Sequence, residues 1–506
     1  MVALTIILAI TAAALVLAWL PRRSGSAAPS IPAKPSSSAA VGEDETPTPK
    51  PLRGTWVVKD GQGRKLWAEE LARKGIDPTA AIPLGNGYLL PEDETKHTKI
   101  IGVPGTGKSM SIKHILARVA ERPEQRVVIP DPDGGYARLF YRPERGDRIV
   151  NPFDARDCGW DINADVTQPY HSAEFAAALV PENSGDGREW SHYGQQLVGA
   201  TIDALKRRGD LSVESLYQTI STTPPDEYAE LLVGSPAATF FRRDNERMRG
   251  SIESVVAGAI AGLRYMRNGS LSLSQYAQGD NRGWIFITYK AEQIAALKNV
   301  IATMMRVVIF ALMSRPEGDS GTWLVIDELD ALGKIAGLQD ALQRLRKFGG
   351  RCVLAFQSLG PLVEIYGHGI SSALVENCSS TLLLRSSSGA TMSTSRFAAG
   401  LLGEREVLRT TWTTNKSNGS NFSLGSLARL APSGSRNAGT CTNTTRVTEP
   451  AIIPSQIEQL PDLSGYAHSH DSPFWSRCTI EPYTGESVAE AFVPRAPESE
   501  QSQEAA

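Results

Sequence analysis

Residues 102–109, Gly-Val-Pro-Gly-Thr-Gly-Lys-Ser, carry the clearest chemical signal in this chain of 506 residues. Glycines at these offsets let successive backbone N–H groups turn toward one point, where they bind phosphate oxygens. Lys108 adds a positive charge for the β- and γ-phosphates, and the Ser109 hydroxyl is a ligand for Mg²⁺. The β-type residues 99–101 precede the loop, and residues 110–119 suit a helix whose positive dipole end faces it. The pattern predicts a site for ATP and Mg²⁺ made of Gly102, Val103, Pro104, Gly105, Thr106, Gly107, Lys108 and Ser109.

A second acidic strand end lies far down the chain. Residues 323–328 read Trp-Leu-Val-Ile-Asp-Glu, an apolar run that ends in two carboxylates. In phosphate-loop ATPases the first acid helps to hold Mg²⁺ and the second deprotonates the attacking water. Asp327 is therefore a predicted metal ligand and Glu328 a predicted catalytic base. The structural alternative is a core strand that ends at two solvated acids, but the loop at residues 102–109 favours the catalytic interpretation.

Three further polar residues, Asp131, Gln357 and Arg385, each follow an apolar β-type run. In open parallel sheets, ligands bind at the carboxyl ends of strands. Gln357 could sense the γ-phosphate or the attacking water, and Arg385 could contact a phosphate of its own or a neighbouring subunit's nucleotide. These two residues join Lys108 and Glu328 as predicted catalytic residues. For each of the three, loop capping or plain surface exposure is the alternative.

A basic run, Arg344, Arg346 and Lys347, precedes Phe348-Gly349-Gly350. In a ring-shaped motor this run would line the channel and contact nucleic-acid phosphates, which makes its three residues the predicted DNA-binding set. The alternative is a solvated helix face. The net charge of the chain is −3, so any DNA binding must come from a local patch of this kind.

The segments between these motifs predict an α/β fold. Residues 172–278 have helical patterning and few β-type runs, which predicts an all-α insertion. Strands at 284–289, 323–326, 351–356 and 381–384 follow, with a helix at 291–313 between the first two, as is typical of a doubly wound parallel sheet. The expected parts are a transmembrane anchor (1–23), a flexible linker (24–52), a nucleotide-binding domain in two parts (53–165 and 281–490), an all-α domain (166–280) and a disordered tail (491–506).

The N-terminal segment predicts a membrane anchor. Residues 2–20 are uncharged and are followed by Pro21-Arg22-Arg23. A helix of this length spans roughly 28 Å, close to the thickness of the bilayer hydrocarbon. The two arginines follow the segment and none precedes it, which places the rest of the chain in the cytoplasm. A cleaved signal peptide is the alternative, but its positive n-region is missing.

The remaining composition adds two expectations. The five cysteines have no metal-ligand spacing and are expected to be reduced thiols, as in a cytoplasmic protein. Residues 410–445 are rich in Thr, Asn, Ser and Gly, which predicts a long hairpin or surface loop without an assigned role.

Taken in order, the motifs resemble those of the membrane-anchored coupling ATPases of conjugative type IV secretion, the TraD/TrwB type. Six stretches between residues 55 and 485 carry the likeness. Among them, Asn151-Pro152-Phe153-Asp154-Ala155-Arg156 and Gln357-Ser358 are more specific than the phosphate loop. The six stretches are residues 97–109, 131–135, 146–160, 323–332, 348–367 and 453–466.

The resemblance implies a RecA-like nucleotide-binding domain interrupted by an all-α domain and assembled as a homohexamer. It also implies ATP-driven transport of single-stranded DNA, with bound relaxase and relaxosome proteins, to the inner-membrane components of the secretion channel. The resemblance implies that Lys108, Ser109, Asp327 and Glu328 are the ATPase residues. Many relatives have two membrane helices and an extended C-terminal domain, whereas one hydrophobic segment and a short acidic tail are visible in this sequence.

Two other functions compete with a DNA-pumping ATPase. A membrane receptor could recruit relaxase or effector proteins and use the nucleotide only as a switch, but a switch would not need the Glu328 base. A chromosome-segregation translocase shares the same engine, but the all-α insertion and residues 151–156 argue against it.

Overall fold

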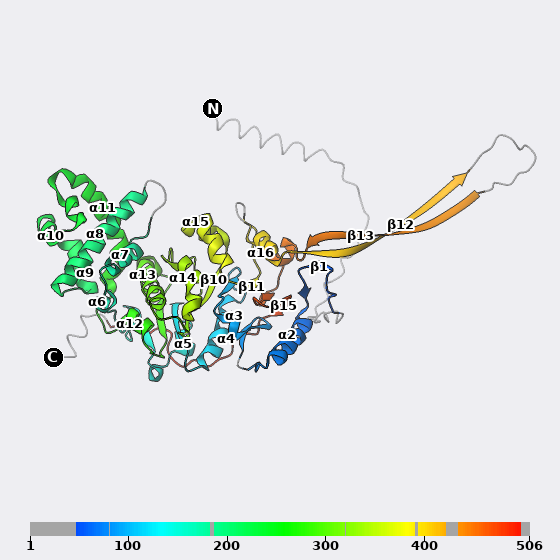
Figure 1. The fold of residues 1–506 in the computed structure, drawn as a ribbon, viewed down its shortest axis with the longest axis horizontal. Helices are drawn as coiled ribbons and strands as arrows, with labels where there is room; N and C mark the ends of the chain where they lie inside the picture. Colours follow the sequence, from blue (N-terminus) through cyan, green and yellow to red (C-terminus); the bar gives the residue numbers. More distant parts are fainter. Residues whose placement is uncertain are drawn as a thin grey trace, which may run out of the picture. The chain divides into compact units, whose positions relative to one another are not determined.

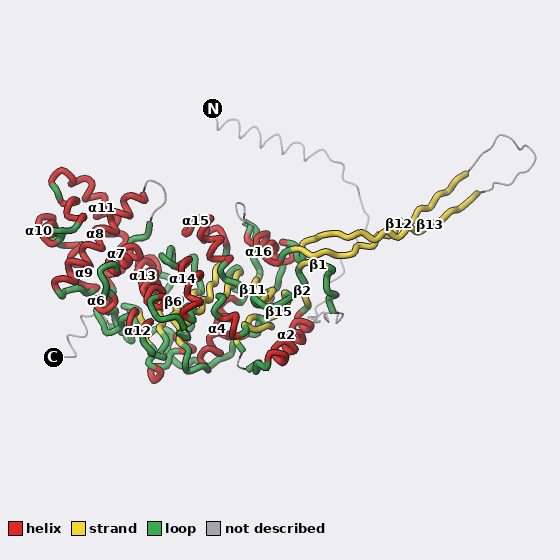
Figure 2. Tube along the Cα trace, viewed as in Figure 1, coloured by secondary structure: helices red, strands yellow, loops and turns green. Residues whose placement is uncertain are grey.

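A ten-stranded sheet forms the centre of the fold, with the strand order β2-β15-β14-β11-β5-β10-β9-β6-β8-β7 (Figures 1 and 2). The strands from β11 to β7 in this order are all parallel, and β14 runs antiparallel to β11 and β15 on either side. The strands of this sheet are β2 (Val57–Val58), β5 (Thr98–Ile101), β6 (Arg126–Pro132), β7 (Arg148–Val150), β8 (Ile285–Tyr289), β9 (Thr322–Ile326), β10 (Arg351–Phe356), β11 (Ser380–Leu384), β14 (Ser464–His468) and β15 (Trp475–Thr479). The predicted strands at 284–289, 323–326, 351–356 and 381–384 are confirmed.

The computed structural model describes residues 47–79, 81–182, 187–318, 320–389, 393–420 and 434–496. The predicted anchor (1–23), most of the predicted linker (24–52) and residues 497–506 lie outside the described residues. Two smaller sheets accompany the large one: β3 (Ile82–Leu84) pairs with β4 (Gly87–Leu89), and β1 (Arg53–Gly54) pairs with the long hairpin of β12 (Glu404–Ser420) and β13 (Gly434–Pro450).

Helices α6 to α12 fill the chain between β7 and β8, and the described residues of this segment contain no strand. This agrees with the predicted all-α insertion, while the boundary residues 166 and 280 stay predictions. The helices are α6 (Ile162–Asp165), α7 (His171–Leu179), α8 (Gly187–Arg208), α9 (Val213–Thr222), α10 (Pro225–Leu231), α11 (Glu246–Ile260) and α12 (Leu273–Gln278).

Both faces of the central parallel strands are covered, so β8, β9, β10 and β11 are buried at every position and are largely apolar rather than alternating. Successive residues point to opposite faces. In β9, Trp323 and Val325 pack with α4 (Lys108–Ala120) and α5 (Ala137–Phe140), whereas Leu324 and Ile326 pack with α13 (Ile294–Met313) on the other side. The other helices near the sheet are α14 (Leu338–Arg344), α15 (Leu359–Glu376), α16 (Thr394–Leu402) and α17 (Pro454–Glu458).

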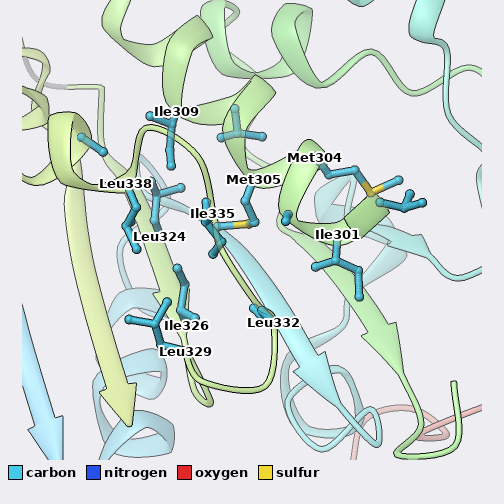
Figure 3. Packing of buried hydrophobic residues seen from close by; sticks show 14 of the residues in the cluster. Ile301, Met304, Met305, Ile309, Leu324, Ile326, Leu329, Leu332, Ile335 and Leu338 are labelled. Carbon is cyan, nitrogen blue, oxygen red and sulfur yellow. The ribbon is translucent and has the colours of Figure 1, made fainter. Parts of the chain in front are cut away.

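Helix α13 is the one described helix that is long and apolar enough to cross a membrane, and it lies in the core instead. Figure 3 shows Met305 and Ile309 of this helix beside Leu324 of β9, with Ile335 of the following loop between them. All four side chains are almost completely buried. The apolar length of α13 is therefore explained by its place between the sheet and the helical insertion.

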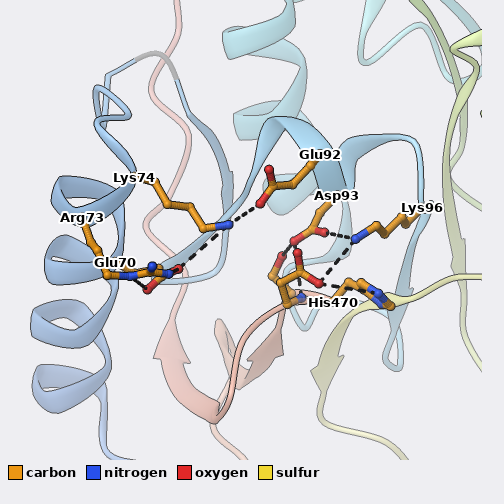
Figure 4. Close-up of polar contacts among 9 residues, drawn as sticks. Glu70, Arg73, Lys74, Glu92, Asp93, Lys96 and His470 are labelled. Carbon is orange, nitrogen blue, oxygen red and sulfur yellow. Dashed lines mark hydrogen bonds and ion pairs between the residues drawn. The ribbon is translucent and has the colours of Figure 1, made fainter.

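A polar cluster joins α2 (Asp60–Lys74) and α3 (Pro91–Glu94) to the loop after β14 (Figure 4). Lys74 pairs with Glu92, and Lys96 pairs with the completely buried Asp93 at 2.8 Å and with Asp471 at 3.4 Å. Asp93 and Lys96 lie directly before the strand β5, which leads into the phosphate loop.

The first residues of the predicted C-terminal tail are packed on the nucleotide-binding fold. Val493 donates its N–H to the Asp154 carboxylate at 3.3 Å, and Arg495 lies 3.8 Å from the Asp157 carboxylate. Residues 491–496 thus differ from the disordered tail expected from composition, because they cover the loop at residues 151–157.

Candidate nucleotide-binding site

The predicted site residues meet at one edge of the large sheet. Strand β10 lies between β5 and β9, and all three run parallel. Their carboxyl ends therefore place the phosphate loop, Gln357 and the pair Asp327-Glu328 side by side. Asp131 lies within the carboxyl end of β6, the next strand beyond β9.

The phosphate loop connects β5 directly to α4, as predicted. A Cβ atom on Gly102 would lie 2.7 Å from the Leu384 Cβ atom and 2.8 Å from the Thr106 hydroxyl oxygen, so no side chain fits there. Gly107 has a φ of 113°, which strains any other residue. The loop is also anchored by the main chain, since the Val103 N–H donates to the Arg385 carbonyl at 2.9 Å.

Lys108 is the first residue of α4 and only 7% exposed. Its ammonium group donates to the carbonyl oxygens of Gly102 (2.8 Å) and Val103 (3.3 Å), which holds the charge inside the loop. Burial lowers the pKa of Lys108, while the carboxylates of Asp327 and Glu328 act in the opposite direction. The geometry supports a cation held where phosphates bind.

The predicted metal ligands are in direct contact although they lie 218 residues apart in sequence. The Ser109 hydroxyl donates to Oδ2 of Asp327 at 2.6 Å. The Tyr136 hydroxyl donates to the same oxygen at 2.6 Å. The other carboxylate oxygen, Oδ1, is buried and accepts no hydrogen bond from any described residue.

This arrangement fits Mg²⁺. The cation prefers oxygen ligands and is usually held by one or two protein groups, with water and phosphate oxygens completing its shell. The Ser109 oxygen has lone pairs left for a metal while its O–H donates to the Asp327 carboxylate. Within the described part of the chain, no three His, Cys, Asp or Glu side chains gather as a complete metal cage.

Asp131 supports the tyrosine rather than facing the phosphate loop. Its carboxylate is fully buried and accepts the backbone N–H groups of Tyr136 (3.0 Å) and Ala137 (2.7 Å). Burial raises the pKa of Asp131 to about 7, and these N–H groups oppose the rise. Asp131 thus fixes the turn that brings Tyr136 to Asp327.

Glu328 is half-buried beside Asp327. Burial raises the pKa of Glu328, and the carboxylates of Asp327 and Asp330 raise it further. A raised pKa suits a group that must accept a proton near neutral pH. Gln357 follows β10 and is half-buried, and its amide makes no hydrogen bond within the described residues, so it is free to meet a ligand.

Arg385 follows β11, next to β5, and its side chain is 35% exposed. The guanidinium pairs with Asp462 of the same chain at 2.5 Å and makes a long hydrogen bond of 3.5 Å to the Leu460 carbonyl. An arginine held in this way can act on a phosphate only if it exchanges Asp462 for it.

The predicted DNA-binding residues lie away from this site. Arg344 ends α14, and Arg346 and Lys347 belong to the 3₁₀ turn η5 (Leu345–Phe348) at the amino end of β10. All three are exposed, and Lys347 lies 3.7 Å from Glu317. The strand β10 therefore separates this basic run from Gln357 at its other end.

Two residues at the site were not identified from the sequence. Tyr136 ends the Asp131–Tyr136 turn, and nothing in the spacing could pair it with Asp327, 191 residues away. Leu463 lies against Gly107 and donates its N–H to the Thr106 carbonyl at 3.1 Å. Through Leu463, the segment 453–466 covers the phosphate loop. This contact is a structural role for one of the six stretches that carry the family resemblance.

Residues 81–480 match the model of a family described as type IV secretion-system coupling protein DNA-binding domain. The chain belongs to this family. The match spans most of the sequence and contains every predicted site residue.

Curated relatives of this coupling protein family give the same assignment. The chain is 27% identical over 440 residues to the coupling protein TraD of Escherichia coli strain K12, which covers 85% of this chain and 58% of TraD. It is 23% identical over 272 residues to the conjugal transfer protein TraG of Escherichia coli, over 46% of this chain and 42% of TraG. The chain thus spans about half the length of these relatives.

Solved structures of the coupling protein TrwB have the same fold. The unbound form without its first 70 residues superposes with a TM-score of 0.74 at 26% identity, over 88% of this chain and 96% of that one. Further TrwB structures contain the ATP analogue ADPNP, the GTP analogue GDPNP, or ADP with Mg²⁺. The RecA-like nucleotide-binding fold expected for this family is confirmed.

Proposed function

We propose that this chain is the coupling ATPase of a conjugative type IV secretion system. It is a single-pass protein of the bacterial inner membrane with its ATPase domain in the cytoplasm. It binds ATP and Mg²⁺ and assembles as a homohexamer. Hydrolysis moves single-stranded DNA with its bound relaxase and relaxosome proteins to the inner-membrane channel components.

One contact carries the catalytic part of this proposal: the hydrogen bond from Ser109 to Asp327, with Glu328 next to it. This hydrogen bond brings the phosphate loop and the acidic strand end together, so that Ser109 and Asp327 form one metal site next to the base Glu328. The chemistry supplied by Mg²⁺ is neutralisation of phosphate charge. Lys108 and the loop N–H groups bind the phosphates, and Glu328 takes a proton from the attacking water.

A second candidate function is a receptor that recruits relaxase or protein effectors and uses the nucleotide as a switch. A raised pKa makes the Glu328 carboxylate a stronger base than an ordinary glutamate. A stronger base is better suited to take a proton from water, which favours hydrolysis over a nucleotide switch.

The two functions differ in what stimulates turnover. We expect the protein without residues 2–20 to hydrolyse ATP several-fold faster when single-stranded DNA is added, because a DNA translocase couples hydrolysis to bound DNA. The measurement is phosphate release at saturating ATP, with and without DNA and with and without relaxase. Turnover that ignores DNA and responds only to relaxase would support the receptor instead.

The Tyr136 hydroxyl is expected to matter for Mg²⁺. Tyr136→Phe removes one of the two donors that orient the Asp327 carboxylate. Partners of metal ligands are typically worth about 10–100-fold in metal affinity, so the Mg²⁺ concentration for half-maximal binding of a fluorescent ADP should rise by about tenfold. Tyr141→Phe is the matched control, since the Tyr141 hydroxyl has no hydrogen bond among the described residues. An unchanged Mg²⁺ requirement in Tyr136→Phe would contradict this role.

Arg385→Ala distinguishes a catalytic arginine from a structural one. If Arg385 contacts a phosphate, the loss of one charge-assisted hydrogen bond should reduce kcat about 10–100-fold. Asp462→Asn removes the ion pair within the chain and should leave kcat within about threefold of wild type. Equal losses in the two variants would mean that the Arg385–Asp462 pair is only structural.

A further inference from the structure

The hairpin of β12 and β13 contributes no residue to the proposed ATPase site. Its strands pair without interruption from Glu404 with Pro450 to Ser420 with Gly434. At about 3.3 Å per residue, 17 residues make a ribbon roughly 56 Å long. Figure 1 shows it leaving the body of the fold beside β1. We call residues 407–420 and 434–447 the arm.

Among the described residues, the contacts between the hairpin and the rest of the fold lie at its inner end. β1 pairs with Arg405 and Glu406, and the side-chain hydrogen bonds that the structure gives farther out join the two strands to each other. Isolated two-stranded hairpins are marginally stable in water. Contact with a further surface would therefore stabilise an arm of this length.

The two faces of the arm differ because side chains alternate along each strand. On the even-numbered face, Leu408 lies opposite Arg446, and Trp412 lies opposite Thr442. Leu408 is 55% exposed and Trp412 72% exposed, so this face presents two large apolar side chains to solvent. On the odd-numbered face the described side chains include no Leu or Trp. Val407 lies opposite Val447, Arg409 opposite Thr445, Thr411 opposite Asn443 and Thr413 opposite Cys441.

The charge of the arm has one sign. The arm contains Arg409, Lys416, Arg436 and Arg446 and no Asp or Glu, in a chain whose net charge is −3. The acidic residues of the hairpin lie at its inner end. There Glu449 pairs with Arg405 at 3.0 Å and Glu406 lies 3.8 Å from Arg446. A tryptophan and a leucine among basic residues match an anionic membrane surface, whose interface accommodates tryptophan and whose headgroups attract Lys and Arg.

The position of the arm fits the same surface. The hairpin leaves the fold next to β1, at the point where the chain arrives from the predicted linker and anchor. The arm and the predicted linker therefore begin at neighbouring strands of the fold.

We propose that the even-numbered face of the arm, with Leu408, Trp412 and Arg446, lies on the anionic lipid headgroups of the inner leaflet. This contact rests on the proposed membrane anchoring and adds a second attachment to the membrane. The second attachment would restrict the rotation of the ATPase domain about the linker. Single-stranded DNA and a second copy of the chain are the other occupants, and the experiment below separates them.

The cysteines of this chain make the test practical. Cys441 is exposed on the arm, whereas Cys352, Cys378 and Cys478 are buried. Burial raises the pKa of the half-buried Cys158 to about 12, which keeps its thiol unreactive, and Cys158→Ser removes it altogether. A fluorescent label at Cys441 reports on the odd-numbered face. A label at Thr442→Cys in a Cys441→Ser background reports on the even-numbered face, opposite Trp412.

The full chain is reconstituted in vesicles of phosphatidylcholine with phosphatidylglycerol, and separately in phosphatidylcholine alone, with brominated acyl chains as quencher. We expect quenching of the label at 442 to exceed that at 441 by about threefold, only with phosphatidylglycerol. Arg446→Glu should abolish the difference and Arg446→Lys should keep it. Arg208→Glu, an exposed arginine of α8, is the matched control and should have no effect.

Equal quenching in the two lipids, or equal quenching at 441 and 442, would overturn the proposal. A response of the label to single-stranded DNA in place of lipid would assign the arm to nucleic acid. Energy transfer between labelled copies that is independent of lipid would assign it to a second copy. ATP hydrolysis and vesicle attachment of Arg446→Glu should equal wild type, so a failure of the arm contact leaves the coupling ATPase standing.

Discussion

Replacing Lys108 with alanine is expected to reduce ATP hydrolysis to background, a loss of at least about 10³-fold. The ammonium group is almost buried inside the loop and is held by the carbonyl oxygens of Gly102 and Val103. When the ammonium group is removed, the negative charge on the β- and γ-phosphates loses its main protein partner. In a site of low dielectric this loss is costly.

The Lys108→Ala fold should survive, because the loop conformation depends on its glycines and on main-chain hydrogen bonds such as that from Val103 to Arg385. The measurement is phosphate release together with thermal unfolding. Lys113→Ala, farther along α4 and partly exposed, is the matched control and should retain full turnover. Substantial hydrolysis by a folded Lys108→Ala would contradict the assignment of the loop.

Replacing Glu328 with glutamine has the second largest expected effect. Glutamine keeps the size of the side chain and cannot accept the proton of the attacking water, so kcat should fall about 10²–10⁴-fold. Affinity for a fluorescent ATP should stay within a few-fold of wild type, because Lys108, Ser109 and Asp327 are untouched. Glu121→Gln, an exposed acid at the end of α4, is the control.

The pH profile gives an independent reading of Glu328. Burial raises the pKa of this carboxyl above its ordinary value of 4.5. As the pH falls through the raised pKa, the base becomes protonated and hydrolysis is lost, so the acid limb of the wild-type kcat should lie above pH 4.5. Glu328→Gln should lose this limb. A variant that keeps both its turnover and its acid limb would mean that another group is the base.

Much of the fold could be predicted because its signals are local. Strands covered on both faces are apolar runs, so β8 to β11 fall close to the expected ranges. The helices α7 to α11 fill the segment in which the spacing of apolar residues predicts helices. The Ser109–Asp327 contact was also predictable, because two motifs with fixed roles imply it. In both cases each signal lies within a short segment of the sequence.

The remaining features depend on contacts between distant segments. Tyr136 acquires its role from Asp327, and Arg385 acquires its partner from Asp462, pairs that no spacing reveals. The segment 410–445 could be a hairpin or a loop by composition, because it is rich in threonine and asparagine and has too few apolar residues to mark a period of two. Its register of 17 pairs is visible only in the structure.

The central claim is that hydrolysis at this site moves DNA, and displacement of streptavidin from biotinylated single-stranded DNA tests it most directly. We predict that the chain, reconstituted in vesicles with ATP and Mg²⁺, strips streptavidin from one end of the strand. Lys108→Ala should bind the same DNA without displacing it. If the wild type hydrolyses ATP on this DNA and leaves the streptavidin in place, the chain is not a DNA-moving motor.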